Sequence, residues 1–139
     1  MVKKDILKHM KPKGVRLSKN IVPIEYSMRL KPDLDNFTFE GVETITLSIL
    51  KKTKILTLHS KELEIEAARV GEVFAKISYN EKKETATFIF SKFIPVGKTK
   101  LTIVFKGILN NQMRGFYRSK YTISGKEHNM ATTQFEATD

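Results

Sequence analysis

The stretch that decides the fold is Gly41-Val42-Glu43-Thr44-Ile45-Thr46-Leu47-Ser48-Ile49. In its second half, apolar residues alternate with hydroxyl side chains. Successive side chains of a β-strand point to opposite faces, so this period of two predicts a strand that buries one face and wets the other. Gly41 stands at the head of the run, and an isolated glycine in a strand predicts a bulge or bend.

The same pattern extends outward in both directions. Before the glycine, alternating apolar residues stand at Ile24, Tyr26, Met28 and Leu30. Beyond the run, short segments rich in Ile, Val, Thr and Phe and bounded by turn residues predict strands at 54–59, 63–70, 73–79, 86–90 and 101–105. No segment of helical length has a 3.6-residue period. We therefore expect an all-β protein, a single domain built as an antiparallel twisted β-sandwich or saddle.

The length of 139 residues suits one domain of ordinary size. We interpret residues 1–19 as a basic flexible leader and residues 20–139 as the β-domain. The leader contains five early lysines, at Lys3, Lys4, Lys8, Lys11 and Lys13. Because the chain has no cysteine, it has no disulfide framework, no thiolate zinc ligand and no cysteine nucleophile.

The net charge of +10 raises the question of an anionic partner. Outside the leader, Lys and Arg mostly alternate with apolar residues, which is typical of a solvated strand face. The basic and aromatic segment at 114–121 is interpreted as a strand with Phe116 buried rather than as a surface for single-stranded nucleic acid. No apolar run approaches the ~18 residues of a spanning helix, and the N-terminus does not resemble a secretory signal. We expect no nucleic-acid partner, no membrane partner and a cytoplasmic location.

No constellation of catalytic or metal-binding residues stands out. The histidines His9, His59 and His128 have no second ligand at a zinc-binding spacing, and there is no HExxH. The sequence also has no nucleophile elbow around a serine and no glycine-rich phosphate loop. We therefore predict no catalytic residue and no metal ligand within this chain.

Six segments, taken in order, carry a resemblance to a known family. They are Arg16-Leu17-Ser18-Lys19-Asn20-Ile21-Val22-Pro23-Ile24-Glu25-Tyr26, Leu30-Lys31-Pro32-Asp33-Leu34, Phe37-Thr38-Phe39-Glu40-Gly41, Thr57-Leu58-His59-Ser60, Gly107-Ile108-Leu109-Asn110-Asn111-Gln112-Met113-Arg114-Gly115-Phe116-Tyr117-Arg118-Ser119, and Ala131-Thr132-Thr133-Gln134-Phe135-Glu136. The set resembles the N-terminal domain of zinc aminopeptidases of the aminopeptidase N and puromycin-sensitive aminopeptidase family. It departs from the family at Asn111, where Asp is usual, and at Ala137, where Pro is usual.

The resemblance implies a hydrolase that removes N-terminal residues from peptides. In such enzymes a following, thermolysin-like domain carries the GxMEN loop and the HExxH zinc site, and neither motif occurs here. Zinc would be the cofactor of the full-length enzyme, and this chain alone is expected to be catalytically inactive. Its partners would be the N-terminus of a peptide substrate and the catalytic domain of the same protein. A domain separated from that partner is expected to self-associate through the apolar surface left exposed.

The resemblance also assigns substrate-binding residues, Gln134 and Glu136. Glu136 would bind the α-ammonium group of the substrate, and Gln134 would shape the pocket for the first side chain. Because they are two positions apart, a strand would present both on one face. Phe135 would then point to the opposite face, which we predict to be core. Tyr117 and Arg118 are expected to pack or to bridge domains, outside the site.

Two other functions stay open at this level. The family's fold recurs in a transcription-factor subunit without zinc ligands, so a non-catalytic β scaffold for protein–protein interaction is one alternative. A basic β-module that binds nucleic acid is the other, and little but the charge favours it. Retention of Gln134 and Glu136 favours the enzyme, because a scaffold has no need of an ammonium-binding carboxylate.

Overall fold

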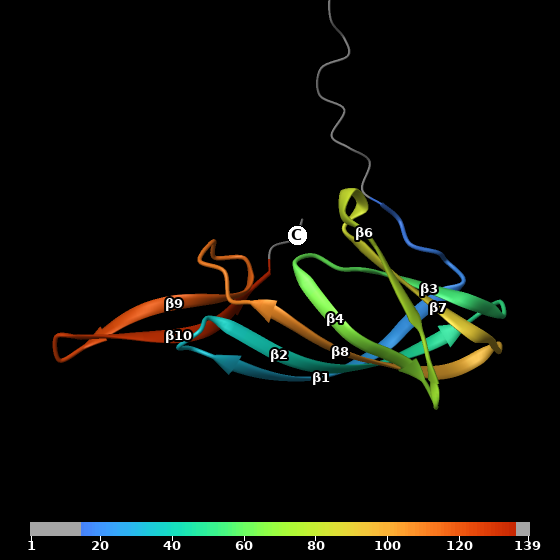
Figure 1. Cartoon of the computed structure of the whole chain (residues 1–139), viewed down its shortest axis with the longest axis horizontal. Coiled ribbons are helices and arrows are strands. Elements are labelled where there is room, and N and C mark those ends of the chain that lie inside the picture. The colour runs from blue at the N-terminus through green and yellow to red at the C-terminus, as the bar shows by residue number, and fades with distance from the viewer. Residues whose placement is uncertain (1–14, 136–139) are drawn as a thin grey trace, which may run out of the picture.

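The computed structural model describes residues 15–135 and confirms an all-β, antiparallel fold (Figure 1). The elements of this part of the chain are β1 (Ile21–Asp33), β2 (Thr38–Ile49), β3 (Thr53–His59), β4 (Leu63–Val70), β5 (Val73–Phe74), β6 (Lys76–Asn80), the single-turn 3-10 helix η1 (Glu81–Lys83), β7 (Thr85–Ile94), β8 (Gly97–Ile108), β9 (Gly115–Ile123) and β10 (Lys126–Gln134).

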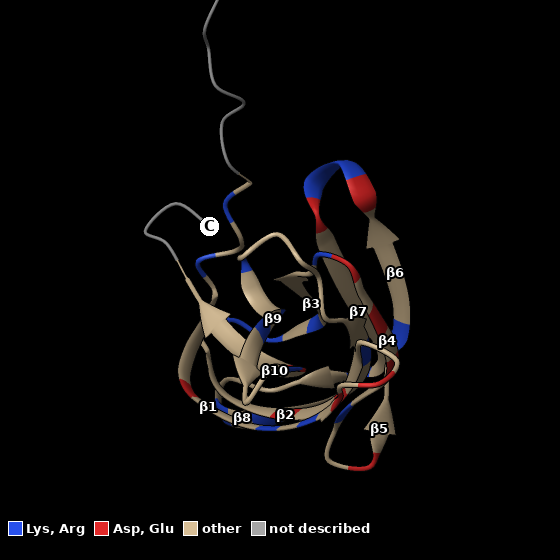
Figure 2. Ribbon diagram, turned by 90° about the vertical axis from the view of Figure 1, so that its left-hand side faces the viewer, with Lys and Arg blue, Asp and Glu red and all other residues tan. Residues whose placement is uncertain are grey.

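The strands form three sheets. A five-stranded sheet has the order β1-β2-β8-β4-β5, a three-stranded sheet has the order β3-β7-β6, and β9 pairs with β10 alone. In Figure 1 the large sheet forms a curved floor, the three-stranded sheet covers one part of it, and the β9–β10 hairpin extends from the opposite end. Basic and acidic residues both occur along the strands of the large sheet (Figure 2). The two larger sheets together form the predicted sandwich or saddle.

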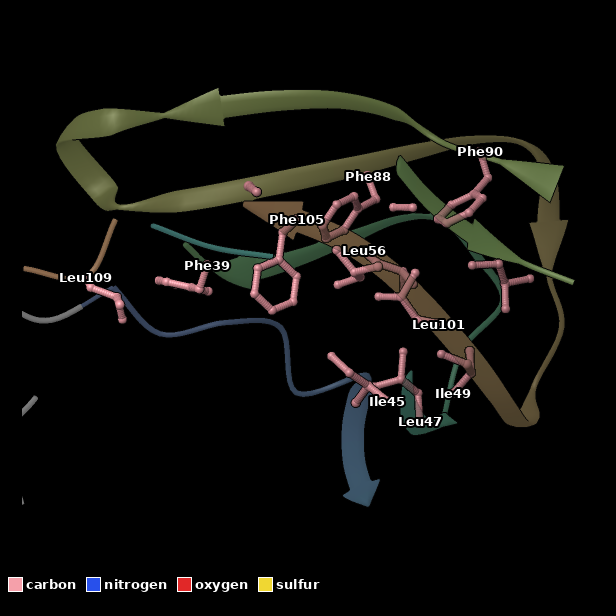
Figure 3. Close-up of a cluster of buried hydrophobic side chains, with 14 residues drawn as sticks. Phe39, Ile45, Leu47, Ile49, Leu56, Phe88, Phe90, Leu101, Phe105 and Leu109 are labelled. Carbon is pink, nitrogen blue, oxygen red and sulfur yellow. The ribbon is translucent and has the colours of Figure 1, made fainter. Parts of the chain in front are cut away.

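The core lies between the two larger sheets and follows the alternation seen in the sequence. Ile45, Leu47 and Ile49 of β2 are each at most 1% exposed. They belong to one buried cluster with Leu101 of β8 and Phe88 of β7 (Figure 3). Burying an aliphatic or aromatic side chain of this size contributes about 1.5–3 kcal/mol relative to exposing it. The apolar residues that recur at every second position of β2 are therefore the ones that pack one sheet on the other.

Gly41 does not form the predicted bulge, because its register with β1 and with β8 is unbroken. The glycine instead makes room for an aromatic ring. Gly41 lies directly across from Phe105, and Phe39 lies directly across from Gly107. A Cβ atom at Gly41 would lie 2.5 Å from Cε2 of Phe105, and one at Gly107 would lie 2.6 Å from Cε1 of Phe39. The two rings meet edge to face, 6.3 Å apart. We name these four residues the glycine–phenylalanine cradle.

One predicted strand also differs in its extent. The segment predicted as one strand at 73–79 divides at Ala75, because β5 pairs with β4 whereas β6 pairs with β7 in the other sheet. The backbone N–H of Ala75 donates to the carbonyl of Ala68 at 2.8 Å where the chain passes between sheets. β1 continues through Pro32, since an edge strand has one side on which no backbone donor is needed.

Candidate functional site

The hairpin that carries Gln134 is built by a two-residue turn. Ser124 and Gly125 both have positive φ, 51° and 77°. Two such residues between antiparallel strands form a type I′ turn, whose twist matches that of the strands. From this turn the register runs without interruption to the pair formed by Gly115 and Gln134. Gln134 therefore lies at the open end of the hairpin, where β10 ends.

The loop between β8 and β9 is fixed by Asn110. Its side-chain Oδ1 accepts the backbone N–H of Gln112 at 2.8 Å, and its Nδ2 donates to the carbonyl of Arg114 at 3.0 Å. Its own carbonyl accepts the backbone N–H of Arg118 at 2.8 Å. Gly115 follows with a φ of 63°, a conformation that glycine adopts without strain. These contacts orient the start of β9 and hence the strand beside Gln134.

One face of the hairpin packs on the body of the domain. The Phe116 ring lies edge to face with Phe39 at 5.0 Å between centroids. The Arg118 guanidinium lies 4.1 Å above the centre of the Phe37 ring, a cation–π contact. Ala131 of β10 packs against the core cluster. The predictions that Phe116 faces inward and that Arg118 is a packing residue agree with this arrangement.

The opposite face of the hairpin holds Gln134. By alternation it shares this outward face with Thr132 and Met130 of β10. The Tyr117 hydroxyl donates to Oε1 of Gln134 at 3.4 Å, which is long for a hydrogen bond between oxygens and therefore weak. Sequence reasoning left Tyr117 outside the site. The signal that could have found it is the hairpin register, which sets Tyr117 opposite Thr132 and diagonal to Gln134.

Glu136, the predicted ammonium ligand, lies outside the described residues. Phe135 is described, and its predicted burial in the core is wrong, because 75% of it is exposed. The reason is that β10 ends at Gln134, so the alternation that would have turned Phe135 inward no longer applies.

Residues 22–139 match the family described as the Peptidase M1 N-terminal domain. The chain belongs to this family.

Curated relatives of the chain are named as aminopeptidases. The chain is 43% identical over 125 residues to Aminopeptidase 2 of Candida albicans, 39% identical over 127 residues to Aminopeptidase M1-C of rice, Oryza sativa subsp. japonica, and 41% identical over 130 residues to the alanine/arginine aminopeptidase of Saccharomyces cerevisiae. The alignments cover 88%, 89% and 88% of this chain, but only 14%, 14% and 15% of the relatives. The M1 N-terminal domain thus spans about one seventh of their length.

The part of this M1 N-terminal domain that the structure describes has no group of three or more His, Asp or Glu side chains suited to a metal ion. His59 is exposed, and the His128 ring stacks on Tyr121 at 5.3 Å between centroids. The described residues include no helix of the length and apolar character needed to cross a membrane. A cavity of about 910 Å³ lies between the β6–β7 end and the start of β2, and no residue of the β9–β10 hairpin lines it.

Glu43 is an unusual carboxylate in this domain. It lies on the core-facing side of β2, next to Met28 of β1 and Ile103 of β8, and burial raises the pKa of its carboxyl. The pKa of the nearby Tyr26 phenol is raised, first by burial and then by the charge of Glu43. No side-chain hydrogen bond or ion pair of Glu43 occurs among residues 15–135.

Replacing Glu43 by glutamine is expected to stabilise the domain at neutral pH. The folded-state pKa is raised, so the folded chain binds the proton more tightly than the unfolded chain, and stability falls as pH rises through that range. Glutamine does not ionise, so the stability of the variant does not fall in this way as pH rises. Urea unfolding at pH 7 and at pH 4 would measure it. We expect the advantage of the variant to be clear at pH 7 and to shrink at pH 4, and an equal effect at both pH values would contradict this origin.

Proposed function

We propose that this chain is the substrate-recognition domain of a zinc-dependent aminopeptidase, and that Gln134 and Glu136 bind the N-terminal residue of a peptide. The observation that carries the proposal is the match of residues 22–139 to the M1 N-terminal domain, which includes this pair. The names of the relatives support an aminopeptidase. The outward direction of Gln134 on the hairpin is compatible with contact to a substrate.

The chemistry of Glu136 fits this role. A peptide's N-terminus differs from every internal position by its free α-ammonium group. A carboxylate in a closed site binds that group through a charge-assisted hydrogen bond, with a net contribution of about 1.5–3 kcal/mol. A blocked N-terminus or an internal amide cannot replace the ammonium and would leave the carboxylate unpaired. Selectivity for peptide N-termini follows from this one group.

The residues that the structure describes, 15–135, do not form a zinc site. Among the described positions the side chains that could hold zinc do not converge, and the chain has no cysteine. Three or four converging ligands are needed for such a site. The proposed zinc therefore belongs to another part of the protein, together with the residues that activate water, and the isolated chain is expected to cleave no peptide.

The outward face of the hairpin is a reasonable contact surface for that other part. Tyr121, Ile123 and Met130 are exposed on it, and each would gain by burial against a neighbouring domain. The same apolar residues support the expected self-association of the isolated chain. A cytoplasmic location stays a prediction, since a further relative, from Saccharomyces cerevisiae, is named as mitochondrial. The absence of a nucleic-acid partner also stays a prediction.

A fusion protein tests the proposal. Residues 22–139 would replace the matching segment of Aminopeptidase 2 of Candida albicans, and hydrolysis of leucyl and alanyl anilides would be compared with that of the N-acetylated anilides. We expect the fusion to cleave only the free-N-terminus substrates and to lose activity when a chelator removes zinc. A fusion that folds but is inactive on both kinds of substrate would favour the non-catalytic scaffold instead.

A further inference from the structure

The end of the sandwich opposite the β9–β10 hairpin combines exposed apolar side chains with lysines that form no ion pair within residues 15–135. Two turns meet there, the turn from β2 into β3 and the turn from β7 into β8, at the right-hand end of Figure 1. Ile49 pairs with Gly97 and Thr53 pairs with Ile94, so the two turns lie side by side. We name the surface the basic tip and define it by Leu50, Lys51, Lys52, Lys54, Lys92, Phe93 and Val96.

The strand pairing pushes Phe93 outward. Thr53 pairs with Ile94, but the next pair is Ile55 with Ile89, so residues 90–93 face Lys54 alone. An excess of residues on one strand bends it away from its partner. The Thr53 side chain stiffens the opposing strand, because its hydroxyl accepts the Ile55 N–H and donates to the Ile55 carbonyl, both at 3.0 Å. The protrusion is therefore set by the backbone.

The apolar members of the tip are largely in contact with solvent. Leu50 is 58% exposed, Phe93 59% and Val96 64%. The ammonium groups of Lys52 and Lys54 lie 5.2 Å and 4.9 Å from the centre of the Phe93 ring. Two cations thus share one exposed ring, and an anion placed beside them would relieve their mutual repulsion.

No carboxylate from these segments neutralises the tip. The sequence has no Asp or Glu between Thr44 and Lys61, or between Thr85 and Lys126. The three ion pairs within residues 15–135 involve Lys61, Lys106 and Lys120, and none involves a lysine of the tip. In Figure 2 acidic segments occur at the β6–β7 turn, along β1, β2 and β4, and at the β4–β5 turn. The tip is therefore a local positive surface with an apolar centre.

We propose that the basic tip docks on an anionic membrane surface, with Leu50, Phe93 and Val96 entering the headgroup region and the lysines contacting lipid phosphates. Apolar side chains surrounded by lysines are the side-chain chemistry that such an interface binds. Lys51 and Lys52 line the smaller of the cavities of about 910 and 620 Å³, but none of the three apolar residues lines either one, and all three are exposed. Lysine without arginine also suits point contacts to phosphate better than stacking on nucleic-acid bases. This proposal differs from the expectation of no membrane partner, which rested on the lack of a spanning run.

Vesicle binding by the 139-residue chain tests the proposal. The probes are vesicles of phosphatidylcholine alone and vesicles with about 30% phosphatidylserine, sedimented at low salt. We expect binding only to the second kind, weakened about fivefold for each of Lys52→Gln and Lys54→Gln and about tenfold for Phe93→Ala. The opposite end of the molecule offers matched controls, Lys126→Gln and the exposed Ile108→Ala, which should bind within about twofold of the parent because neither belongs to the tip. The leader lysines are common to all variants and cancel.

Because the chain has no tryptophan, Phe93→Trp places a single reporter in the tip. Its emission should shift to shorter wavelength and become shielded from acrylamide on phosphatidylserine vesicles, whereas that of Ile108→Trp should not. The proposal would be overturned if the tip substitutions left vesicle binding unchanged. It would also be overturned if the emission of the tryptophan at position 93 did not shift on the vesicles. A blue shift with soluble polyglutamate equal to that with vesicles would assign the tip to an acidic protein instead. Since the test needs no hydrolysis, its failure is separate from failure of the proposed aminopeptidase function.

Discussion

Replacing Glu136 by alanine in the aminopeptidase fusion is expected to lower kcat/KM about 10- to 150-fold on substrates with a free N-terminus. This range is the net value of a hydrogen bond to a charged group, about 1.5–3 kcal/mol, converted at about 1.4 kcal/mol for each factor of ten. In this variant the ammonium group of the substrate no longer has the carboxylate of residue 136 as its hydrogen-bond partner. Steady-state kinetics on leucyl anilide would give the number.

The hairpin itself supplies the control for this substitution. Glu127 lies near the β9–β10 turn and is paired with Lys120 at 2.6 Å, and both side chains are well exposed. Exposed pairs of this kind contribute at most about 1 kcal/mol to stability. Glu127→Ala should therefore leave kcat/KM within about twofold of the parent fusion. Equal losses for Glu127→Ala and Glu136→Ala would point to damage of the hairpin rather than to loss of an ammonium ligand.

Replacing Gly41 by alanine is expected to destabilise the domain by about 1–3 kcal/mol, the cost of adding a methyl group to a filled core. The new Cβ would lie 2.5 Å from Cε2 of Phe105, and that ring is only 6% exposed and has nowhere to move freely. Urea unfolding of the 139-residue chain measures the change. Gly107→Ala should act in the same way through the ring of Phe39.

A second substitution separates this steric cost from the loss of glycine as such. In the Phe105→Leu background, Gly41→Ala should cost less than in the parent by about 0.5–3 kcal/mol, since residues in contact are coupled by about this amount. If the two substitutions simply add, the glycine–phenylalanine cradle does not explain why glycine stands at position 41.

The sequence was informative where the alternation was strong. β4 was predicted with its observed ends, residues 63–70, and in β2 the predicted face, Ile45, Leu47 and Ile49, is the buried one. The function of Gly41 was missed because a glycine facing a ring and a glycine in a bulge have the same local sequence. Only the β2–β8 register, formed between residues about 60 positions apart, tells them apart.

The candidate site shows the same limit. The resemblance to the M1 family identified the segment that contains Gln134, but not its neighbour Tyr117, which reaches it across a hairpin. The place of Phe135 depended on where β10 ends, and one residue of strand decides whether that side chain turns inward. The basic tip could not be predicted from the sequence because Lys52 and Lys54 lie about 40 residues before Phe93 in the chain.

Two competitive inhibitors that differ only in the presence of an α-amino group would test the ammonium-binding role of Glu136 most directly. Their inhibition constants would be measured on the parent fusion and on Glu136→Ala. The account predicts that the parent fusion binds the amino compound at least about tenfold more tightly and that the substitution removes most of this preference while hardly changing the other constant. A preference that survives unchanged in Glu136→Ala would contradict the assignment of Glu136 as the residue that recognises the peptide's N-terminus.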